Sequence, residues 1–429
     1  MAVITSFKRL TFGIMFGYGC MMMALMTPAV LLLTFKMIEI DPDGYTSSFG
    51  LVAGIGAFFA LIGNPIGGAL SDRTNNRFGR RRTWIIIGSL VGCASLLWIS
   101  QATQVWQVMV GWSVAQLFFN FGMAAFTGLV PDQVEESKRG TLSGLIGLIV
   151  PIAMSVGMGI MMAMPNAASS TKWLLVSIIG IVGPLISMFF IKEGKVDIVR
   201  VQGGRTSFAE KLSKVYPNPR KFPSFTWAIV SKFLLMMGFC SSLYLTVMLV
   251  NRMGYTESEA TSTAGTIQII SLFAMALTSV FGGMLSDKFK IQKPFLYGSA
   301  IIMIMGILLF AFVPTYMAFI LASVIISLGG GCFSAVDMAL VTRILPNKDD
   351  AAKDFGLMNV ANALPQSIVP AIAPVLLAIG GWSFFYIALA ACVVGGILAT
   401  RPLPEVGQLP GERPEIMTNE MPTANKLIS

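Results

Sequence analysis

One polar block, residues 67–84, interrupts the apolar sequence and carries the charges best placed to do chemistry. A carboxylate, Asp72, precedes a group of arginines and a glycine: Arg73, Arg77, Gly79, Arg80, Arg81 and Arg82. A carboxylate at a helix end can form strong charge-assisted bonds with arginine or with a helix dipole. We expect Asp72 to act as a gate latch that pairs with an arginine or a neighbouring helix dipole while the cytoplasmic side is closed. The alternative is that the arginines only anchor a cytoplasmic loop.

A weaker copy of this block lies at residues 282–288, 215 positions further on, and makes Asp287 the equivalent gating candidate. At the same offset, Lys138-Arg139-Gly140-Thr141-Leu142 corresponds to Lys353-Asp354-Phe355-Gly356-Leu357. A motif repeated at half the length of an apolar chain predicts two related membrane halves with a pocket between them.

The composition is that of a membrane protein. Of the 429 residues, 55% are hydrophobic and only 12% are charged, against about 25% in soluble domains. Neither a phosphate-binding loop nor an H-E-x-x-H pair occurs, which argues against a nucleotide-driven pump and a metalloenzyme. The chain has no His, and its five cysteines lie apart in apolar runs. We therefore expect no enzyme activity, no metal and no cofactor.

The apolar runs predict twelve transmembrane helices and hence an all-α polytopic protein built from two pseudo-symmetric six-helix bundles. The predicted domains are an N-terminal bundle (1–191), a cytoplasmic linker (192–223), a C-terminal bundle (224–400) and a disordered cytoplasmic tail (401–429). The expected spans are 11–35, 47–70, 83–101, 106–130, 139–163, 172–191, 224–250, 258–285, 294–312, 316–342, 354–378 and 381–400.

The basic residues give the orientation. Of the 30 Lys and Arg residues, only Lys36, Lys172 and Arg252 fall in odd-numbered loops, and Lys232 falls within a span. The positive-inside rule then places both termini in the cytoplasm of a multi-pass protein in the plasma or inner membrane. The net charge of +9 reflects this asymmetry and does not point to a nucleic-acid partner.

Two ionisable residues are the best placed inside expected spans. Lys232 and Asp337 are each roughly 8–12 Å from the cytoplasmic end at 1.5 Å per residue, so one interpretation is that the two form a buried ion pair. A charge at that depth marks a functional site by default. Asp337 is the candidate for binding a coupling proton. The competing interpretation is that Lys232 extends to the membrane surface while Asp337 pairs with Arg343 or another loop base.

Amide side chains form stripes on two expected helices. Gln116 and Asn120 share one face of the fourth span, while Asn359, Asn362 and Gln366 share one face of the eleventh. Amides both donate and accept hydrogen bonds, which suits a neutral polyol. The alternative is that they bond neighbouring helices to each other.

Two aromatic residues complete the predicted substrate site. Tyr18 lies in the glycine-rich part of the first span, and Trp112 lies deep enough in the fourth to stack on a sugar ring. The other tryptophans fall near span ends, where they are typical interface anchors.

The segment Gly68-Ala69-Leu70-Ser71-Asp72-Arg73 through Gly79-Arg80-Arg81-Arg82 resembles the loop 2–3 signature of the major facilitator superfamily. The copy at 283–288 stands where that family has its loop 8–9 copy, and the resemblance covers nearly the whole chain. Within the family, three further stretches are similar to sugar–cation symporters of the sucrose–proton and glycoside–pentoside–hexuronide groups: Leu129-Val130-Pro131-Asp132 with Arg139-Gly140, Val336-Asp337-Met338-Ala339-Leu340-Val341-Thr342, and Asn359 with Leu364-Pro365-Gln366. The second span lacks the acidic pair of sodium-coupled members, which argues against sodium.

The resemblance implies a secondary active transporter that works by alternating access and takes up a sugar or glycoside with a proton. Its partners are then the lipid bilayer, a small-molecule substrate and the coupling proton, and we expect a monomer. A carrier of another small solute (an organic acid, drug or metabolite, including export) and a non-transporting membrane sensor are the alternatives.

Overall fold

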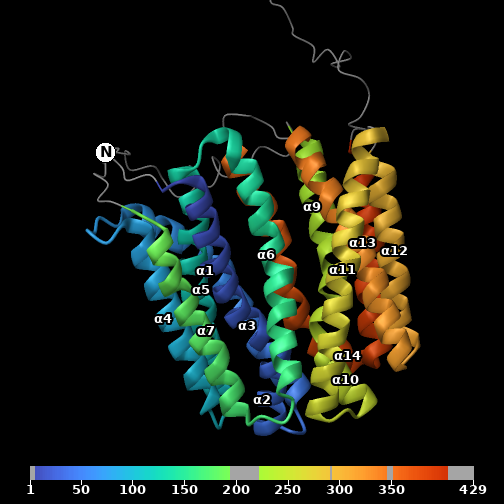
Figure 1. Cartoon of the computed structure of the whole chain (residues 1–429). Helices are drawn as coiled ribbons and strands as arrows, with labels where there is room; N and C mark the ends of the chain where they lie inside the picture. Colours follow the sequence, from blue (N-terminus) through green and yellow to red (C-terminus); the bar gives the residue numbers. More distant parts are fainter. Residues whose placement is uncertain (1–4, 194–221, 290–291, 345–350, 404–429) are drawn as a thin grey trace, which may run out of the picture.

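The computed structural model describes residues 5–193, 222–289, 292–344 and 351–403, and their regular elements are helices that run up and down side by side (Figure 1). The first half consists of α1 (Phe7–Thr27), η1 (Pro28–Leu32), α2 (Leu33–Ile40), α3 (Tyr45–Arg73), α4 (Arg80–Ser100), α5 (Val105–Gln133), α6 (Glu136–Ala163) and α7 (Ser169–Phe190). The segments α1, η1 and α2 form one continuous helical run from Phe7 to Ile40, longer at both ends than the expected 11–35.

The second half consists of α9 (Pro223–Phe239), η2 (Cys240–Tyr244), α10 (Leu245–Met253), α11 (Glu257–Phe289), α12 (Lys293–Phe312), α13 (Tyr316–Ile344) and α14 (Ala351–Thr400). The chain bends sharply inside α14 at Gly380 (φ −149°) and Gly381 (φ 65°), where the backbone leaves the helical conformation. A positive φ is accessible to glycine at little cost. The bend divides α14 into the two expected spans 354–378 and 381–400.

The described part of the chain contains 11 continuous helical segments long and apolar enough to cross a membrane, and the last of them, Val360–Thr400, contains the bend. Twelve spans result, and the predicted all-α membrane fold is confirmed. The first helical run is mostly buried, whereas the apolar stretch of α11 has few buried residues. Large exposed side chains such as Phe273, Leu277 and Phe281 on α11 are the ones that lipid would cover.

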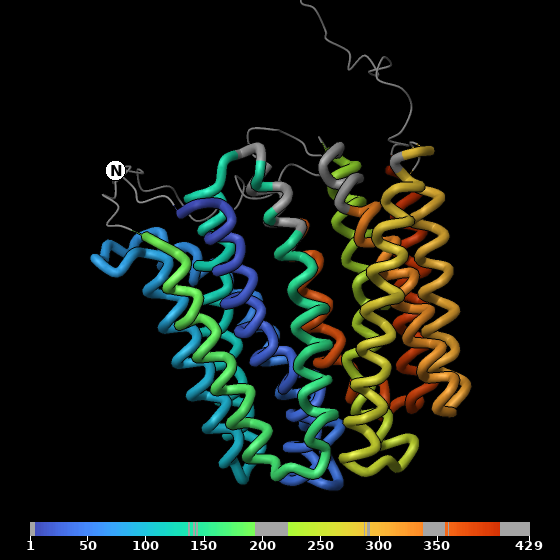
Figure 2. The backbone as a smooth tube through the Cα atoms, in the orientation of Figure 1, coloured from blue at the N-terminus to red at the C-terminus, as the bar shows by residue number. Residues whose placement is uncertain are grey.

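The two halves lie next to each other, with the N-terminal half in blue to green and the C-terminal half in yellow to red (Figure 2). We call the end of the bundle that holds Arg80 and Arg81 the arginine end, and the opposite end, where α2 and α10 finish, the far end. The helix α6 lies beside α11, and the two come closer towards the far end, at the bottom of Figure 1.

Two local departures from α-helix occupy matching places in the halves. The first helical run widens to a π-turn at Pro28–Leu32, and its counterpart tightens to a 3₁₀ turn at Cys240–Tyr244. A proline inside a helix removes a backbone donor, and such turns often mark functional positions. The matching positions support the internal repeat that the sequence predicts.

Helix ends at the far end are capped in the same way in both halves. The Lys36 ammonium donates to the Ser100 carbonyl at the end of α4 (3.2 Å), and the Arg252 guanidinium donates to the Phe310 carbonyl near the end of α12 (2.7 Å). A cation at a helix C-terminus satisfies free carbonyls and the helix dipole. Two of the three basic residues that depart from the positive-inside pattern are thus structural caps.

Candidate gate and transport site

The polar block around Asp72 folds into a clamp centred on Arg81. The Arg81 guanidinium bonds to Asp72 at the end of α3 (2.6 Å) and to Asp132 near the end of α5 (2.8 Å), and it also donates to the Ser71 hydroxyl. Arg80 reaches the other oxygen of Asp132 (2.7 Å). The planar fork of arginine suits this arrangement, since several donors can meet two carboxylates at once.

A second carboxylate holds the start of α4. Glu193, which follows α7, accepts the backbone N–H groups of Arg81 (3.0 Å) and Arg82 (3.0 Å). These are free donors at a helix N-terminus, where a negative charge is stabilised. Gly79 precedes them with φ 102°, and a side chain there would collide with the Glu193 carboxylate. The need for glycine at this position is therefore both conformational and steric.

The clamp joins α3, α4, α5 and Glu193, which lies three residues beyond the end of α7, all in the first half. Sequence reasoning placed Asp72, Arg80, Arg81 and Gly79 here but missed Asp132 and Glu193 as partners. The remaining arginines, Arg73 and Arg77, are exposed, and the Arg77 guanidinium lies 5.3 Å from the centre of the Phe78 ring. The side chain of Asp287 lies outside the residues that the structure describes.

The structure brings Lys232 and Asp337 together. The Lys232 ammonium lies 2.7 Å from a carboxylate oxygen of Asp337, across the contact between α9 and α13. Their side chains are 14% and 13% exposed. A pair with so little water around it is held mainly by its own charges and hydrogen bond. Protonation of the carboxylate would remove the attraction between the two charges and leave the ammonium without a counter-ion in this pair.

The predicted substrate residues of the first half are buried between helices. Trp112 packs against Gly56 of α3, and Tyr18 meets Phe126 edge to face with ring centres 6.0 Å apart. The Asn120 side-chain amide donates to the backbone carbonyl of Gln116 one turn back (2.8 Å). This bond uses one amide N–H and leaves the Asn120 carbonyl oxygen as an acceptor.

The predicted substrate residues of the second half lie on α14. Asn362 is half-buried and Gln366 is exposed, whereas the side chain of Asn359 lies outside the described residues. The contact of these amides and those of α5 with one solute is a prediction.

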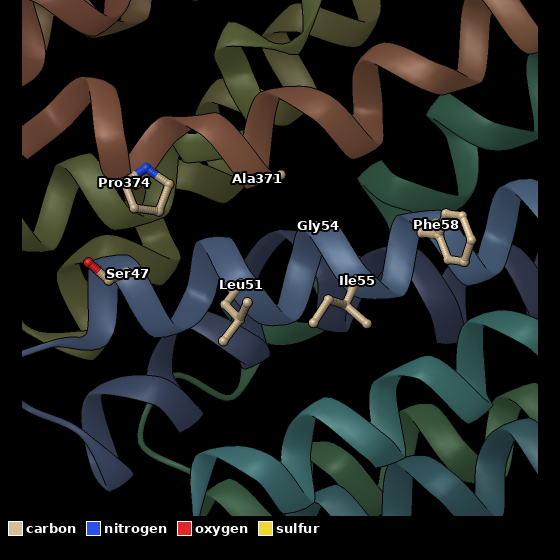
Figure 3. Close-up of a pocket in the computed structure, with 7 residues that line it drawn as sticks. All are labelled: Ser47, Leu51, Gly54, Ile55, Phe58, Ala371 and Pro374. Carbon is tan, nitrogen blue, oxygen red and sulfur yellow. The ribbon is translucent and has the colours of Figure 1, made fainter.

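A cavity of about 510 Å³ lies at the seam between α3 and α14 (Figure 3). Its lining is apolar apart from one hydroxyl: Ser47, Leu51, Gly54, Ile55, Phe58, Ala371 and Pro374. Leu51 and Phe58 are also among the exposed side chains of the bundle surface. Such a lining suits apolar groups and gives a polyol few partners. The amide stripes therefore remain the better candidate for a polar solute.

At the far end, the bonds cross from one half to the other. The Lys172 ammonium at the start of α7 lies 2.7 Å from a carboxylate oxygen of Glu257 at the start of α11. The Thr246 hydroxyl of α10 donates to the Val30 carbonyl inside the π-turn (2.7 Å). Sequence reasoning singled out none of these as site residues, although Lys172 stood out as a basic residue on the wrong side of the charge pattern.

Aromatic and glycine contacts close the same end. The rings of Phe49 and Tyr244, one from each half, meet edge to face with centres 5.3 Å apart. Gly265 of α11 lies so close to Met162 of α6 that a methyl group there would overlap the methionine sulfur. Small residues allow helices to approach in this way within membranes.

The fold and these contacts define a multi-pass helical membrane protein whose two halves meet at one end. The sequence profile of the Major Facilitator Superfamily matches residues 10–348 and, in a second match, 260–419. The chain belongs to this superfamily, as the block around Asp72 predicted, and the family and its solved structures are transporters and not enzymes.

Solved structures share the fold across nearly the whole chain. The D-xylose–proton symporter aligns with a TM-score of 0.69 over 93% of this chain and 98% of that one, at 14% identity. A nucleoside transporter aligns with a TM-score of 0.69 over 91% of this chain and 98% of that one, at 12% identity. At such identities the likeness establishes the fold alone.

Curated relatives match over shorter stretches. The chain is 24% identical to a lactose permease of Lactobacillus helveticus over 42% of its own length and 33% of the relative's. It is 23% identical to a lactose permease of Leuconostoc lactis over 47% and 36%. It is 32% identical to a gentisate transporter of Corynebacterium glutamicum over 34% and 33%. The chain thus spans about a third of the length of these relatives.

Proposed function

We propose that this protein is a secondary active transporter that takes up a sugar or glycoside together with a proton. The observation that carries the proposal is the Lys232–Asp337 pair, which is almost buried between two helices of a membrane carrier. A carrier coupled to protons needs a group whose protonation changes the charge within the bundle. Asp337 fits that role because proton binding removes its negative charge and so its ion pair with Lys232.

A sugar as the solute is supported by the two lactose permeases among the relatives and by the amides of Gln116, Asn120, Asn362 and Gln366. Trp112 and Tyr18 are the proposed aromatic contacts, and Asn359 completes the amide set. We place the arginine end in the cytoplasm, with both termini, because the basic residues gather there. The clamp around Arg81, together with Asp287 in the weaker copy of the sequence block, would then serve the cytoplasmic gate of a monomer in the cell membrane.

An organic anion is the competing solute. The gentisate transporter among the relatives supports it, and the Lys232 ammonium would bind a carboxylate once Asp337 is protonated. This alternative predicts that binding of the anion requires the Lys232 ammonium. Binding of a neutral sugar does not require a charged partner.

Uptake into proteoliposomes tests both solutes. Labelled lactose and labelled gentisate are offered separately under an imposed pH gradient, with and without a protonophore. We expect lactose to accumulate above its outside concentration and the protonophore to abolish that accumulation. Accumulation of gentisate alone would favour the anion. Binding of either solute without any flux would favour a sensor, and the absence of both binding and flux would rule out these two solutes.

A further inference from the structure

Lys172 is a buried cation at the end of the bundle where basic residues are rare. Its side chain is only 1% exposed, and its ammonium donates to the Pro165 carbonyl (2.9 Å) and to the Glu257 carboxylate (2.7 Å). An ammonium removed from water is costly unless it is paired and hydrogen-bonded. The charge partner comes from the other half, so the pair is satisfied only while the two halves touch.

The other two basic residues at the far end behave differently. Lys36 bonds to Glu39 (3.1 Å) and to the end of α4, and Arg252 bonds to carbonyls near the end of α12. Both sets of partners lie in the same half as the cation. These bonds are compatible with either arrangement of the halves, whereas the bond between Lys172 and Glu257 is not.

The Lys172–Glu257 pair also breaks the internal repeat. The residue 215 positions after Lys172 is Ile387, and the residue 215 positions before Glu257 is Pro42. The equivalent seam between α3 and α14 is closed by uncharged contacts, among them Gly54 of α3 against Ala371 of α14. Of the ion pairs in the described residues, Lys172–Glu257 is the one that joins the halves. A charge pair present on one seam alone is not a by-product of the repeat.

We propose that Lys172 and Glu257 form a latch that holds the far end closed and breaks each time that end opens. Opening would bring water to the Lys172 ammonium. Hydration of the ammonium then offsets the loss of its bond to the Glu257 carboxylate. Glu257 is already 45% exposed, so its charge is stable without the pair. A bond of this kind can favour one arrangement and still open within a transport cycle.

Chemical labelling of one buried position reports whether the far end is open. Ala260 is fully buried and lies three residues after Glu257, on the same side of α11. Ala260→Cys is placed in a chain whose five natural cysteines are replaced by alanine. The purified protein in detergent is then treated with a charged maleimide, which reacts only with cysteines that water reaches.

We expect slow labelling in this background and labelling at least about fivefold faster in Lys172→Met/Glu257→Gln, the low end of typical coupling effects. The charge exchange Lys172→Glu/Glu257→Lys should return the rate towards the slow value. Glu39→Gln is the matched control, because it removes a carboxylate from an ion pair at the same end but within one half. It should leave the rate unchanged.

An unchanged labelling rate in the double variant would overturn the latch. A rise in Glu39→Gln as large as that in the double variant would also overturn it, because it would indicate general loosening of the far end. If the double variant does not fold, Glu257→Gln alone keeps Lys172 bonded to the Pro165 carbonyl and answers the same question. The inference rests on the proposed transport function but not on its solute. Labelling needs no solute, so failure here and failure of lactose uptake are separate results.

Discussion

The two ends of the bundle are held together in opposite ways. At the arginine end, Arg81 joins helices of the first half to one another, and Lys232–Asp337 joins two helices of the second. At the far end, Lys172–Glu257 and Thr246–Val30 join one half to the other. In the described residues, the comparison indicates two halves that are bonded within themselves at the arginine end and to each other at the far end, where α6 and α11 also come closer (Figure 1).

A carrier that alternates its access must be able to reverse this arrangement. Bonds within a half preserve its shape during the motion, and bonds between halves set which end is closed. Substitutions at the two ends should therefore differ in kind. Those inside a half should change folding, coupling or, at the clamp, gating, and those between halves should change the balance of conformations.

The largest effect is expected at the second half's ion pair. Asp337→Asn should abolish proton-driven accumulation of lactose while sparing exchange of labelled for unlabelled solute, because exchange needs no net proton movement. Removing the charge of one partner of a buried ion pair costs about 3–5 kcal/mol of stability. The double variant Lys232→Met/Asp337→Asn leaves no unpaired charge and should fold better, yet still fail to accumulate. Accumulation in either variant, measured in proteoliposomes under a pH gradient, would move the coupling site elsewhere.

Removing the centre of the clamp is expected to have the next largest effect. Arg81→Ala leaves Asp72 and Asp132 close together without their common partner, and hydrogen bonds to charged groups contribute about 1.5–3 kcal/mol each. The thermal unfolding temperature should fall by several degrees, and Arg81→Lys should recover only part of the loss since lysine cannot span both carboxylates. An Arg81→Lys protein as stable as the parent would show that charge alone suffices.

Substitutions of the two carboxylates of the clamp should affect stability and transport to different extents. Asp72 is 57% exposed and Asp132 is 20% exposed, so Asp72→Asn should cost only about 0–1 kcal/mol and Asp132→Asn clearly more. Asp72→Asn should nevertheless impair uptake while the protein remains in the membrane, because we assign Asp72 to the gate. Uptake at the parental rate in Asp72→Asn would end its assignment as a gate residue.

The smallest effect is expected at the far-end caps that stay within one half. Arg252→Met removes the cation from the end of α12 and should lower stability by about 0.3–1 kcal/mol, as for other charges at helix ends. Uptake by the folded protein should be unchanged. Thermal unfolding and initial uptake rates measured side by side check both statements, and a strong loss of uptake would mean that this cap also takes part in the motion.

Much of the fold follows from the sequence alone. Apolar runs of spanning length and the repeat at 215 positions predict the helices and the two halves, while the orientation inferred from the asymmetry of Lys and Arg stays a prediction. The bend at Gly380–Gly381 appears in the sequence only as a pair of glycines between two apolar runs. That pair is enough to predict two separate spans. The π-turn at Pro28 and the 3₁₀ turn at Cys240 were not predicted, because local sequence does not say how neighbouring helices deform each other.

The candidate site could be predicted only in part. The depth of Lys232 and Asp337 in their spans suggested the contact that the structure contains. Asp132 and Glu193 were missed as partners of the arginines because they lie 51 and 112 residues from Arg81, a separation that the fold closes and a helical pattern cannot reveal. Glu257 was missed for the same reason, since its pairing depends on how the halves meet.

The central claim is that the two ends open in alternation, and distances across both ends test it most directly. Spin labels at the exposed positions Thr103 and Thr315 report on the far end, and labels at Arg73 and Lys288 report on the arginine end. In Lys172→Met/Glu257→Gln we predict that the first distance lengthens and the second shortens relative to the parent. A far end that opens while the arginine end keeps its distance would contradict the account.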